Sequence, residues 1–467
     1  MKISLKINRS LILLTGFCLV SCEEYLEVPA PNNKITSEVV FSSDETALSA
    51  MTGIYNQLYI ANFSAGWQDS VTVLAGLSGD NIETIRTTDL SFREFQQNEI
   101  LPNNDKNLNV WSSAYNIIYL TNSLLEGIAN SQQITPTVRE KLVGEAKFVR
   151  AFTYFYLVNL YGEVPLILKT DYKENSLASQ SSKEEVNNQI ILDLNASVQL
   201  LSAEYPDGER TYASQNAAKA LLAREYLYQQ NWGKAEALSS EIIEQTSSYR
   251  LLDDLNQVFL ANSQEAIWQL SPVGRGNLAT HTNEGSVFII HPFFSSLSRL
   301  KLSENLISSF QSGDKRLTQW IAFQEKLSVY YPFKYKIRNS TEPVSEYSMV
   351  LRLAEQYLIR AEARARQGNL AGAIADVDII RNRASLQLIT ETNQAITGEQ
   401  LLEVILEERR KELFAEWGHR WLDLKRNGKA TEVLSVKTPL WQETDVLYPI
   451  PAVDRMKNPN LDQNPGY

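Results

Sequence analysis

The stretch ERRKELFAEWGHRWLDLKR, residues 408–426, combines carboxylates, guanidinium groups and a histidine. Because Glu, Asp and His are the commonest proton-transfer groups in enzymes, Glu416 or Asp423 could act as acid or base beside the histidine. On one continuous helix, however, Glu412, Glu416 and Arg420 recur every four residues and Asp423 follows three later, so their charges would satisfy one another. We therefore interpret the stretch as a structural ladder of ion pairs.

Other signs of catalytic or cofactor chemistry are sparse. The histidines His281, His291 and His419 are far apart in the sequence and lack the close pairing of a zinc helix. The segment GRGN, residues 274–277, lacks the strand, helix and lysine that accompany a phosphate loop. The facing carboxylates of a glycosidase, about 5–10 Å apart, depend on the fold and cannot be recognised in one sequence. We predict no catalytic residues, no metal and no cofactor.

The N-terminus has the order of an export signal. Three basic residues among the first nine precede LILLTGFCLV, an apolar run too short for the roughly 20 residues that cross a bilayer. The next segment, LVSC, resembles the lipobox at which lipoprotein signal peptidase cleaves before a lipid-modified cysteine. We expect residues 1–21 to be removed and Cys22 to anchor the protein to the membrane by its acyl chains. An ordinary signal peptide with an incidental cysteine is the alternative, but the small Ser21 favours lipidation.

The remaining body is acidic and has no free thiol. The chain carries a formal net charge of −11, and the segment to be removed contains only basic charges. An acidic body repels nucleic acid, so a neutral ligand fits better. The other cysteine, Cys18, lies in the removed segment, which excludes disulfides, thiolate metal sites and a cysteine nucleophile.

An internal repeat indicates how the body is built. The segments NAAKALLAREYLYQQNWGKAEALSSEII and EQYLIRAEARARQGNLAGAIADVDII align at one constant offset, and each is typical of a helix, a tight turn and a second helix. Alanines at facing positions would let the two helices of each hairpin approach to about 8–9 Å. The aligned pairs are Ala223 with Ala361, Ala235 with Ala373, Ala237 with Ala375, and Ile242 with Ile380.

Start and stop signals predict two further helix pairs. One pair covers NVWSSAYNIIYLTNSLLEGI and the following segment, which starts at an N-cap Thr135 and stops at Gly162. The last pair starts with a capping box of Thr397 and Gln400 and runs through Trp417. An earlier helix is expected to be capped at Ser42. Residues 59–109 and 260–345 show little helical period but many aromatics, so we expect long ordered loops and short strands there.

Seven blocks of the chain resemble, in order, the SusD/RagB family of outer-membrane lipoproteins of the Bacteroidetes. The blocks are SCEEYLEVPAP, EAKFVRAFTYFYLVNLYGEVPLI, NAAKALLAREYLYQQNWGKAEAL, QEAIWQL, LRLAEQYLIRAEARARQGNLAGAIADVDIIRNRA, ERRKELFAEWGHRWLDLKRNG and LYPIPAVDRMKNPNLDQNPGY. The resemblance implies a mainly α SusD-like fold with four tetratricopeptide-like helix pairs plus long loops and short strands. It also implies one compact body with an N-terminal region, 22–230, and a C-terminal region, 231–467.

The same resemblance implies a function. Such a protein binds oligosaccharide or polysaccharide at the cell surface and delivers it to a SusC-like TonB-dependent β-barrel in the outer membrane. In this family the 408–426 block is a structural signature, which agrees with its interpretation as ion pairs. The RagB side of the family implies peptide or other nutrient cargo as the alternative. An enzyme that degrades glycans and a helical scaffold for other proteins are the remaining hypotheses.

A sugar ring offers an apolar face and a rim of hydroxyls, so its site needs an exposed aromatic edged by polar side chains. Family members place ligand contacts in two loop regions of the chain, without a fixed motif. In the first region we predict Trp67, edged by Asp69, Asp80, Asn81 and Arg86; in the second we predict Trp320, Tyr330 and Tyr331. Phe293 and Phe294 could form a platform or contact the transporter. For Trp111, Trp232, Trp268, Trp417 and Trp421 we expect packing roles, and Trp441 is undecided.

Overall fold

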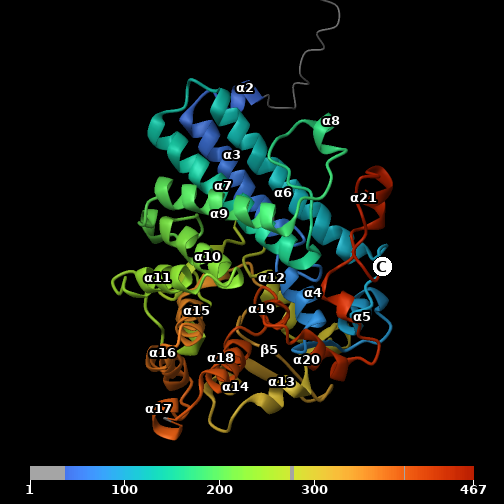
Figure 1. The fold of residues 1–467 in the computed structure, drawn as a ribbon, viewed down its shortest axis with the longest axis vertical. Helices are drawn as coiled ribbons and strands as arrows, with labels where there is room; N and C mark the ends of the chain where they lie inside the picture. The colour runs from blue at the N-terminus through green and yellow to red at the C-terminus, as the bar shows by residue number, and fades with distance from the viewer. Residues whose placement is uncertain (1–36, 274–277, 394) are drawn as a thin grey trace, which may run out of the picture.

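Helices dominate the computed structural model, which describes residues 37–273, 278–393 and 395–467 (Figure 1). The prediction of a mainly α fold with short strands is therefore confirmed. The predicted signal segment and Cys22 lie outside the described residues. No helix in the described ranges is long and apolar enough to cross a membrane.

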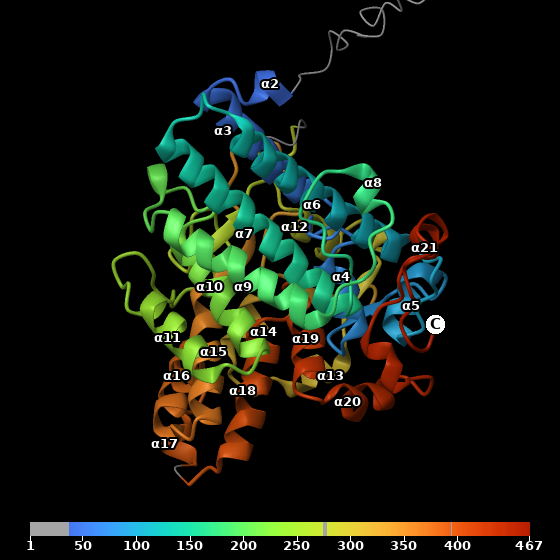
Figure 2. The ribbon, with the colours of Figure 1, turned by 45° about the horizontal axis from the view of Figure 1, so that its top comes forward.

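The long helices form a continuous series in which each one packs against the next. Helix α6 packs on α7, α7 on α9, α9 on α10, α10 on α11 and α11 on α15; α15 packs on α16, and α18 contacts both. Figures 1 and 2 show this series running along one side of the molecule, from α6 and α7 at one end to α16 and α18 at the other. Its bounds are α3 Asp44–Ile60, α6 Asp105–Asn130, α7 Pro136–Tyr161, α9 Lys183–Leu200, α10 Gln215–Tyr228, α11 Trp232–Ile243, α15 Leu353–Arg366, α16 Leu370–Arg383 and α18 Gly398–Glu412.

Local signals in the sequence place several of these helix ends. Helix α7 follows Thr135, has proline as its first residue and ends at Gly162, whose φ of 80° suits a residue without a Cβ. The capping box of Thr397 and Gln400 is present at the start of α18. The first long helix starts one residue later than predicted, because Ser43 rather than Ser42 accepts the hydrogen bond from Thr46 N.

The two aligned segments form the predicted helical hairpins, α10 with α11 and α15 with α16. Ala223 and Ala235 in the first hairpin, and Ala361 and Ala373 in the second, have no exposed surface. Small side chains therefore occupy equivalent packed positions in both repeats, as predicted. Ala237 and Ala375 occupy equivalent positions too, but both are exposed, so they do not face the partner helix as expected.

Shorter elements cover the other side of the series (Figure 2). Three two-stranded antiparallel sheets, β1–β3, β2–β6 and β4–β5, are present in the described residues. The strands are β1 Ile82–Thr84, β2 Ala266–Leu270, β3 Leu300–Leu302, β4 Ile321–Gln324, β5 Val329–Pro332 and β6 Ser348–Arg352. The short helices are α2 Ser37–Val40, α4 Val71–Ser78, α5 Leu90–Gln97, α8 Tyr172–Asn175, α12 Asn283–Phe288, α13 Glu304–Ser309, α14 Lys315–Gln319, α17 Ile389–Thr392, α19 His419–Arg426, α20 Ala430–Lys437 and α21 Ala452–Lys457, with 3₁₀ turns η3 Pro206–Gly208, η4 Leu255–Gln257, η5 Ser295–Leu297 and η6 Glu443–Val446.

One large apolar core joins distant parts of the chain. It draws side chains from α3 to α11, from β2 and β6, and from α19 to the C-terminal segment. A smaller core surrounds Trp320, and a third lies between α15, α16 and α18. The tryptophans expected to pack are buried at positions 111, 268, 417 and 421, whereas Trp232 and Trp441 are partly buried against the large core.

Candidate functional site

The charged stretch 408–426 is divided between two helices in the structure. Helix α18 ends at Glu412, and α19 starts at His419. Between them Ala415, Trp417 and Gly418 have φ angles of 54°, 44° and 69°, a left-handed conformation that interrupts a helix. The prediction of one continuous helix through Trp417 is therefore wrong, because this turn redirects the chain.

The charges of the stretch are paired, but with partners from other elements. The predicted ladder along one helix is wrong: Arg420 pairs with Asp80 and Glu407, and Asp423 pairs with Arg409 and Arg426. The glutamates face basic side chains from a loop, from strand β6 and from helices α14 and α16. Glu408 pairs with Arg316 and Arg381; Glu412 with Arg316, Arg352 and Arg383; and Glu416 with Lys334 and Arg352.

Burial and these partners set the protonation of the cluster. Burial opposes ionisation of Glu412, Glu416 and Asp423, but the neighbouring guanidinium groups outweigh it and lower the pKa of each carboxyl. Burial and nearby cations, Arg224 first among them, lower the pKa of His419 well below its usual value. All four side chains are buried, so a substrate in solution cannot reach them. The cluster has the properties of a structural core.

Two of the predicted edge residues, Asp80 and Asn81, belong to this buried network. Asp80 accepts hydrogen bonds from Arg420 at 2.7 and 3.1 Å and pairs with Arg410 at 2.8 Å. Burial raises the pKa of Asp80, but the hydrogen bond and charge of Arg420 outweigh it, so the pKa is lowered overall. Asn81 accepts from Arg410 Nε at 2.8 Å and is buried. Neither side chain is available to edge a sugar site, which corrects the prediction for both.

The prediction that Trp320 forms part of the ligand site is also wrong. The ring has no exposed surface, and its Nε1 donates to the Leu255 carbonyl at 2.9 Å. Lys334 Nζ lies 4.6 Å from the ring centroid. Trp320 is thus a core residue of the second apolar cluster and cannot stack on a sugar in this structure.

Trp67 lies at the surface, on a loop that packs against α12. Its side chain is 40% exposed. Asn283 Nδ2 donates to the Ala65 carbonyl at 2.7 Å, which fixes the loop to the first turn of α12. Gly66 has a φ of +67°, and a Cβ at this position would lie 2.2 Å from the carboxyl carbon of Glu284. The loop therefore approaches α12 as closely as it does only because glycine precedes Trp67.

The segment that leaves α12 carries two further exposed aromatics. Phe293 is 80% exposed and Phe294 is 59% exposed. His291 Nδ1 accepts hydrogen bonds from the backbone N–H groups of both, at 3.1 and 3.0 Å, so one imidazole shapes the turn that presents them. The His291 and Phe294 rings are 4.9 Å apart. We use the name aromatic surface for Trp67, Phe293 and Phe294, because the Trp67 loop is hydrogen-bonded to α12 and the Phe293–Phe294 turn follows α12 in the chain.

Polar groups lie beside this segment. β3 follows it and pairs with β1, and Ile85 N donates to the Arg299 carbonyl at 2.7 Å. The side chain of Arg299 forms an ion pair with Asp89. Arg86 is the residue after Ile85 and is partly exposed. The predicted Arg86 therefore lies beside the β1–β3 pair, while Asp69 is tied to α6 through Lys106 and Asn109.

The predicted tyrosines lie on the β4–β5 hairpin, and β5 packs against β3. Tyr330 is 38% exposed, and its ring lies 4.8 Å from that of Phe323 on the paired strand. Tyr331 is partly buried, and burial raises the pKa of its hydroxyl. The structure thus places Tyr330 beside a second exposed aromatic, Phe323, on the same face of the β4–β5 hairpin. The sequence analysis did not select Phe323.

The described residues contain no group of three or more His, Asp and Glu side chains that could hold a metal ion. The aromatic surface offers apolar ring faces beside arginine and carboxylate groups. Such an arrangement is suited to binding, because it supplies stacking faces and hydrogen-bonding groups.

Comparisons with known proteins agree with this architecture. A family model described as "Starch-binding associating with outer membrane" matches residues 24–227, and a model described as "SusD family" matches residues 322–438. SusD-like protein P25 of Formosa agariphila is 25% identical over 95% of this chain and 95% of its own. A SusD superfamily protein from Bacteroides vulgatus superimposes with a TM-score of 0.81 at 20% identity, covering 91% of this chain and all of its own. A laminarin-binding SusD-like protein superimposes with a TM-score of 0.77 at 24% identity over 91% of this chain and all of its own.

These matches cover both halves of the chain in the family order. The fold is the mainly helical SusD fold, with its helix series and short sheets. The chain belongs to the SusD/RagB family.

Proposed function

We propose that the protein binds oligosaccharide or polysaccharide at the aromatic surface and delivers it to a SusC-like TonB-dependent transporter. The observation that carries the proposal is the exposure of Trp67, Phe293 and Phe294, the first on a loop hydrogen-bonded to α12 and the other two on a turn shaped by His291. Large aromatics are usually buried, so three exposed rings held in place need a reason. Stacking on the apolar face of a sugar ring is one that suits their chemistry.

The family relationship supports a glycan as the cargo. One matching model is described as starch-binding, and one structural neighbour binds laminarin. The polar groups near the aromatic surface, Arg86, Asp89 and Arg299, can donate to or accept from hydroxyls. Neutral sugars need no basic patch, which fits a chain of net charge −11.

We further propose that Cys22 carries a lipid that holds the protein at the cell outer membrane, facing outward. The lipobox-like LVSC and the acidic pair Glu23 and Glu24 support this assignment. Radiolabelled palmitate should enter the native protein in cells and should not enter a Cys22→Ala variant. A variant that still takes up the label would refute the anchor.

Affinity electrophoresis in gels that contain laminarin or starch tests the binding proposal. Trp67→Ala and Phe293→Ala should each abolish most of the retardation while leaving the thermal unfolding curve unchanged. Tyr172→Ala, which removes an exposed ring on α8, is the matched control and should bind as the native protein does. Unchanged retardation in both aromatic-surface variants would reject this surface, and binding of peptides in place of glycans would support the peptide alternative.

A further inference from the structure

A second site is suggested by a large cavity on the helix series, away from the aromatic surface. Its volume is about 930 Å³, and it shares no residue with the aromatic surface. The first turns of α9 form one wall, and the ends of α7 and α10, the start of α11 and part of α19 form the rest. Pockets of about 300–1,000 Å³ hold compact organic ligands, so a short oligosaccharide is of suitable size.

The charge of this cavity is opposite to that of the whole protein. Lys183, Lys234, Lys425 and Arg426 line it, against a single lining carboxylate, Glu184. The charge of the Arg426 guanidinium is already compensated: it donates two hydrogen bonds to the Glu362 carboxylate, at 2.6 and 2.7 Å, and pairs with Asp423 at 2.8 Å. The lysines are different: within the described residues none of the three forms an ion pair.

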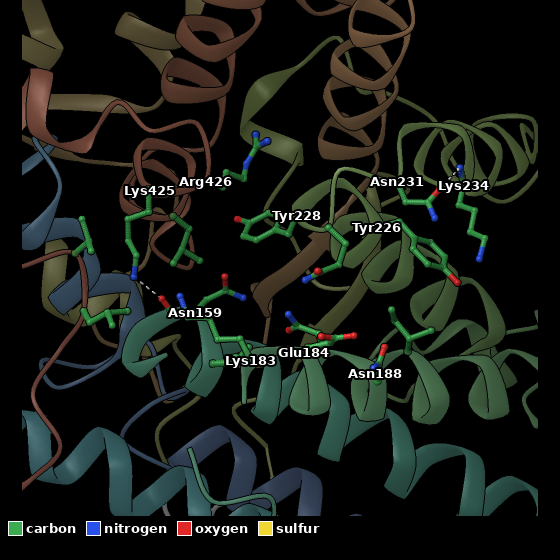
Figure 3. Close-up of a pocket in the computed structure, with 17 residues that line it drawn as sticks. Asn159, Lys183, Glu184, Asn188, Tyr226, Tyr228, Asn231, Lys234, Lys425 and Arg426 are labelled. Atoms are coloured by element: carbon green, nitrogen blue, oxygen red, sulfur yellow. Dashed lines mark hydrogen bonds between the residues drawn. The ribbon is translucent and has the colours of Figure 1, made fainter. Parts of the chain in front are cut away.

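Two of these lysines, Lys183 and Lys425, repel each other electrostatically. Lys425 Nζ donates to the Asn159 carbonyl, the contact drawn as a dashed line in Figure 3. Burial and then the charge of Lys183 lower the pKa of Lys425 well below its usual value. An anion between the two ammonium groups would replace this repulsion with two attractions.

The rest of the lining suits a ligand with many hydroxyls. Figure 3 shows Lys183, Glu184 and Asn188 along α9, across the cavity from Tyr226 and Tyr228. The Tyr228 hydroxyl is buried and has no hydrogen-bond partner among the described residues. Amide side chains, which both donate and accept, are spread around the cavity. They are Asn159, Asn187, Asn188, Gln229 and Asn231.

We propose that this cavity binds an acidic oligosaccharide, with a sugar carboxylate between Lys183 and Lys425 and sugar hydroxyls on the surrounding amides. Arg426, the only arginine that lines the cavity, is already paired, so the lysines would hold the anionic group, and the surrounding amides suit the hydroxyls of a sugar that carries it. The site goes beyond the function proposed above, because it lies on different elements and selects a charged ligand.

Isothermal titration calorimetry of the purified protein with a short oligomer of a hexuronic acid tests this proposal. The matched probe is the same oligomer with its carboxylates reduced to alcohols. The acidic oligomer should bind, with affinity falling at high salt, and the reduced oligomer should bind at least about tenfold more weakly. Equal affinities for the two oligomers, no binding of the acidic one, or tighter binding of a glutamate-rich peptide would each overturn the proposal.

Variants then locate the binding. Lys183 is exposed, so Lys183→Gln should fold normally and lower the affinity at least about tenfold, and Lys183→Glu should lower it further. Lys173→Gln, an exposed lysine on α8 outside the cavity, should change nothing. Trp67→Ala should leave this binding intact, which separates it from the aromatic surface. Unchanged affinity in Lys183→Glu, or loss of affinity in Trp67→Ala, would refute the site.

Discussion

Arg352 and Glu416 form a two-armed ion pair, with Nε 2.8 Å from Oε2 and Nη2 2.9 Å from Oε1. Arg352 is the last residue of β6, and Glu416 lies in the turn between α18 and α19. The pair therefore ties the turn to the sheet. Both side chains are buried, and Arg352 also pairs with Glu265 and Glu412, so removing Glu416 would take away one of its three carboxylate partners.

Glu416→Ala should lower the free energy of unfolding by about 3–5 kcal/mol, since it leaves the buried Lys334 without its carboxylate partner and removes one partner of Arg352. Urea denaturation followed by circular dichroism measures the loss. Glu407→Ala is the control, because its carboxylate is 41% exposed and lies 3.8 Å from Arg410, and it should cost less than about 1 kcal/mol. A Glu416→Ala variant as stable as the native protein would show that the cluster contributes little.

The stability should depend on pH through Glu225. Burial raises the pKa of this carboxyl from 4.5 to about 8, so the folded state keeps a proton that the unfolded chain releases. Its contribution to stability is complete below pH 4.5 and is lost as the pH rises through 8, by up to about 1.4 kcal/mol per pH unit. Glu225→Gln should flatten the curve of unfolding free energy against pH between these values.

Two other buried carboxyls limit how flat that curve becomes. Burial raises the pKa of Glu145 and of Glu284 to about 7, so part of the slope remains in Glu225→Gln. Glu244→Gln replaces an exposed carboxyl at the end of α11 and should leave the curve as it is. An equal slope in native protein and Glu225→Gln would mean that Glu225 is ionised in the fold.

Gly66→Ala should weaken glycan binding more than its backbone cost explains. The left-handed conformation costs an alanine about 1–2 kcal/mol, and the new Cβ would also push against the Glu284 carboxyl and displace the Trp67 loop. Gly313→Ala is the matched control: its φ is +86°, with no atom within 4 Å of the added Cβ. Calorimetric titration with laminarin should give reduced affinity for Gly66→Ala alone. Equal losses of affinity in Gly66→Ala and Gly313→Ala would show that the Trp67 loop takes no part in binding.

Trp320→Ala and Tyr330→Ala should separate packing from binding. Trp320 is fully buried, so its truncation should cost about 3–5 kcal/mol of stability, measured by urea denaturation. Tyr330→Ala should change stability by less than about 1 kcal/mol, because the residue is 38% exposed and lies outside the apolar cores. A stable Trp320→Ala that fails to bind glycan would restore the original assignment of Trp320 as a ligand contact.

Features set by neighbouring residues were predictable from the sequence. The start of α7 after Thr135, its end at Gly162 and the capping box at Thr397 depend on local backbone chemistry. The hairpins of α10–α11 and α15–α16 were visible because the same spacing of small residues occurs twice. Helix α4 was missed because all eight of its residues are buried, which leaves no alternation of apolar and polar faces to detect.

Features set by distant partners were not predictable. An exposed and a buried tryptophan have the same letter in a sequence, so Trp67 and Trp320 could be separated only by the packing around them. Asp80 was predicted to be available for a ligand, but it pairs with Arg410 and Arg420, which are more than three hundred residues away in the sequence. The tandem Phe293 and Phe294 could be noticed in the sequence, since two bulky rings follow proline in a segment with little helical period. Nothing in the sequence indicated that His291 shapes that turn.

The wide spacing of the partners in the charged cluster also constrains the order of assembly. Arg316, Arg352 and Arg383 are all made before the glutamates of α18 that neutralise them. A growing chain that stops short of residue 408 has only Asp314 and Glu265 to neutralise these three guanidinium groups, so burying all three would be costly. The C-terminal half must therefore stay open until α18 has been synthesised, and truncations before α18 should be degraded rather than accumulate as stable fragments.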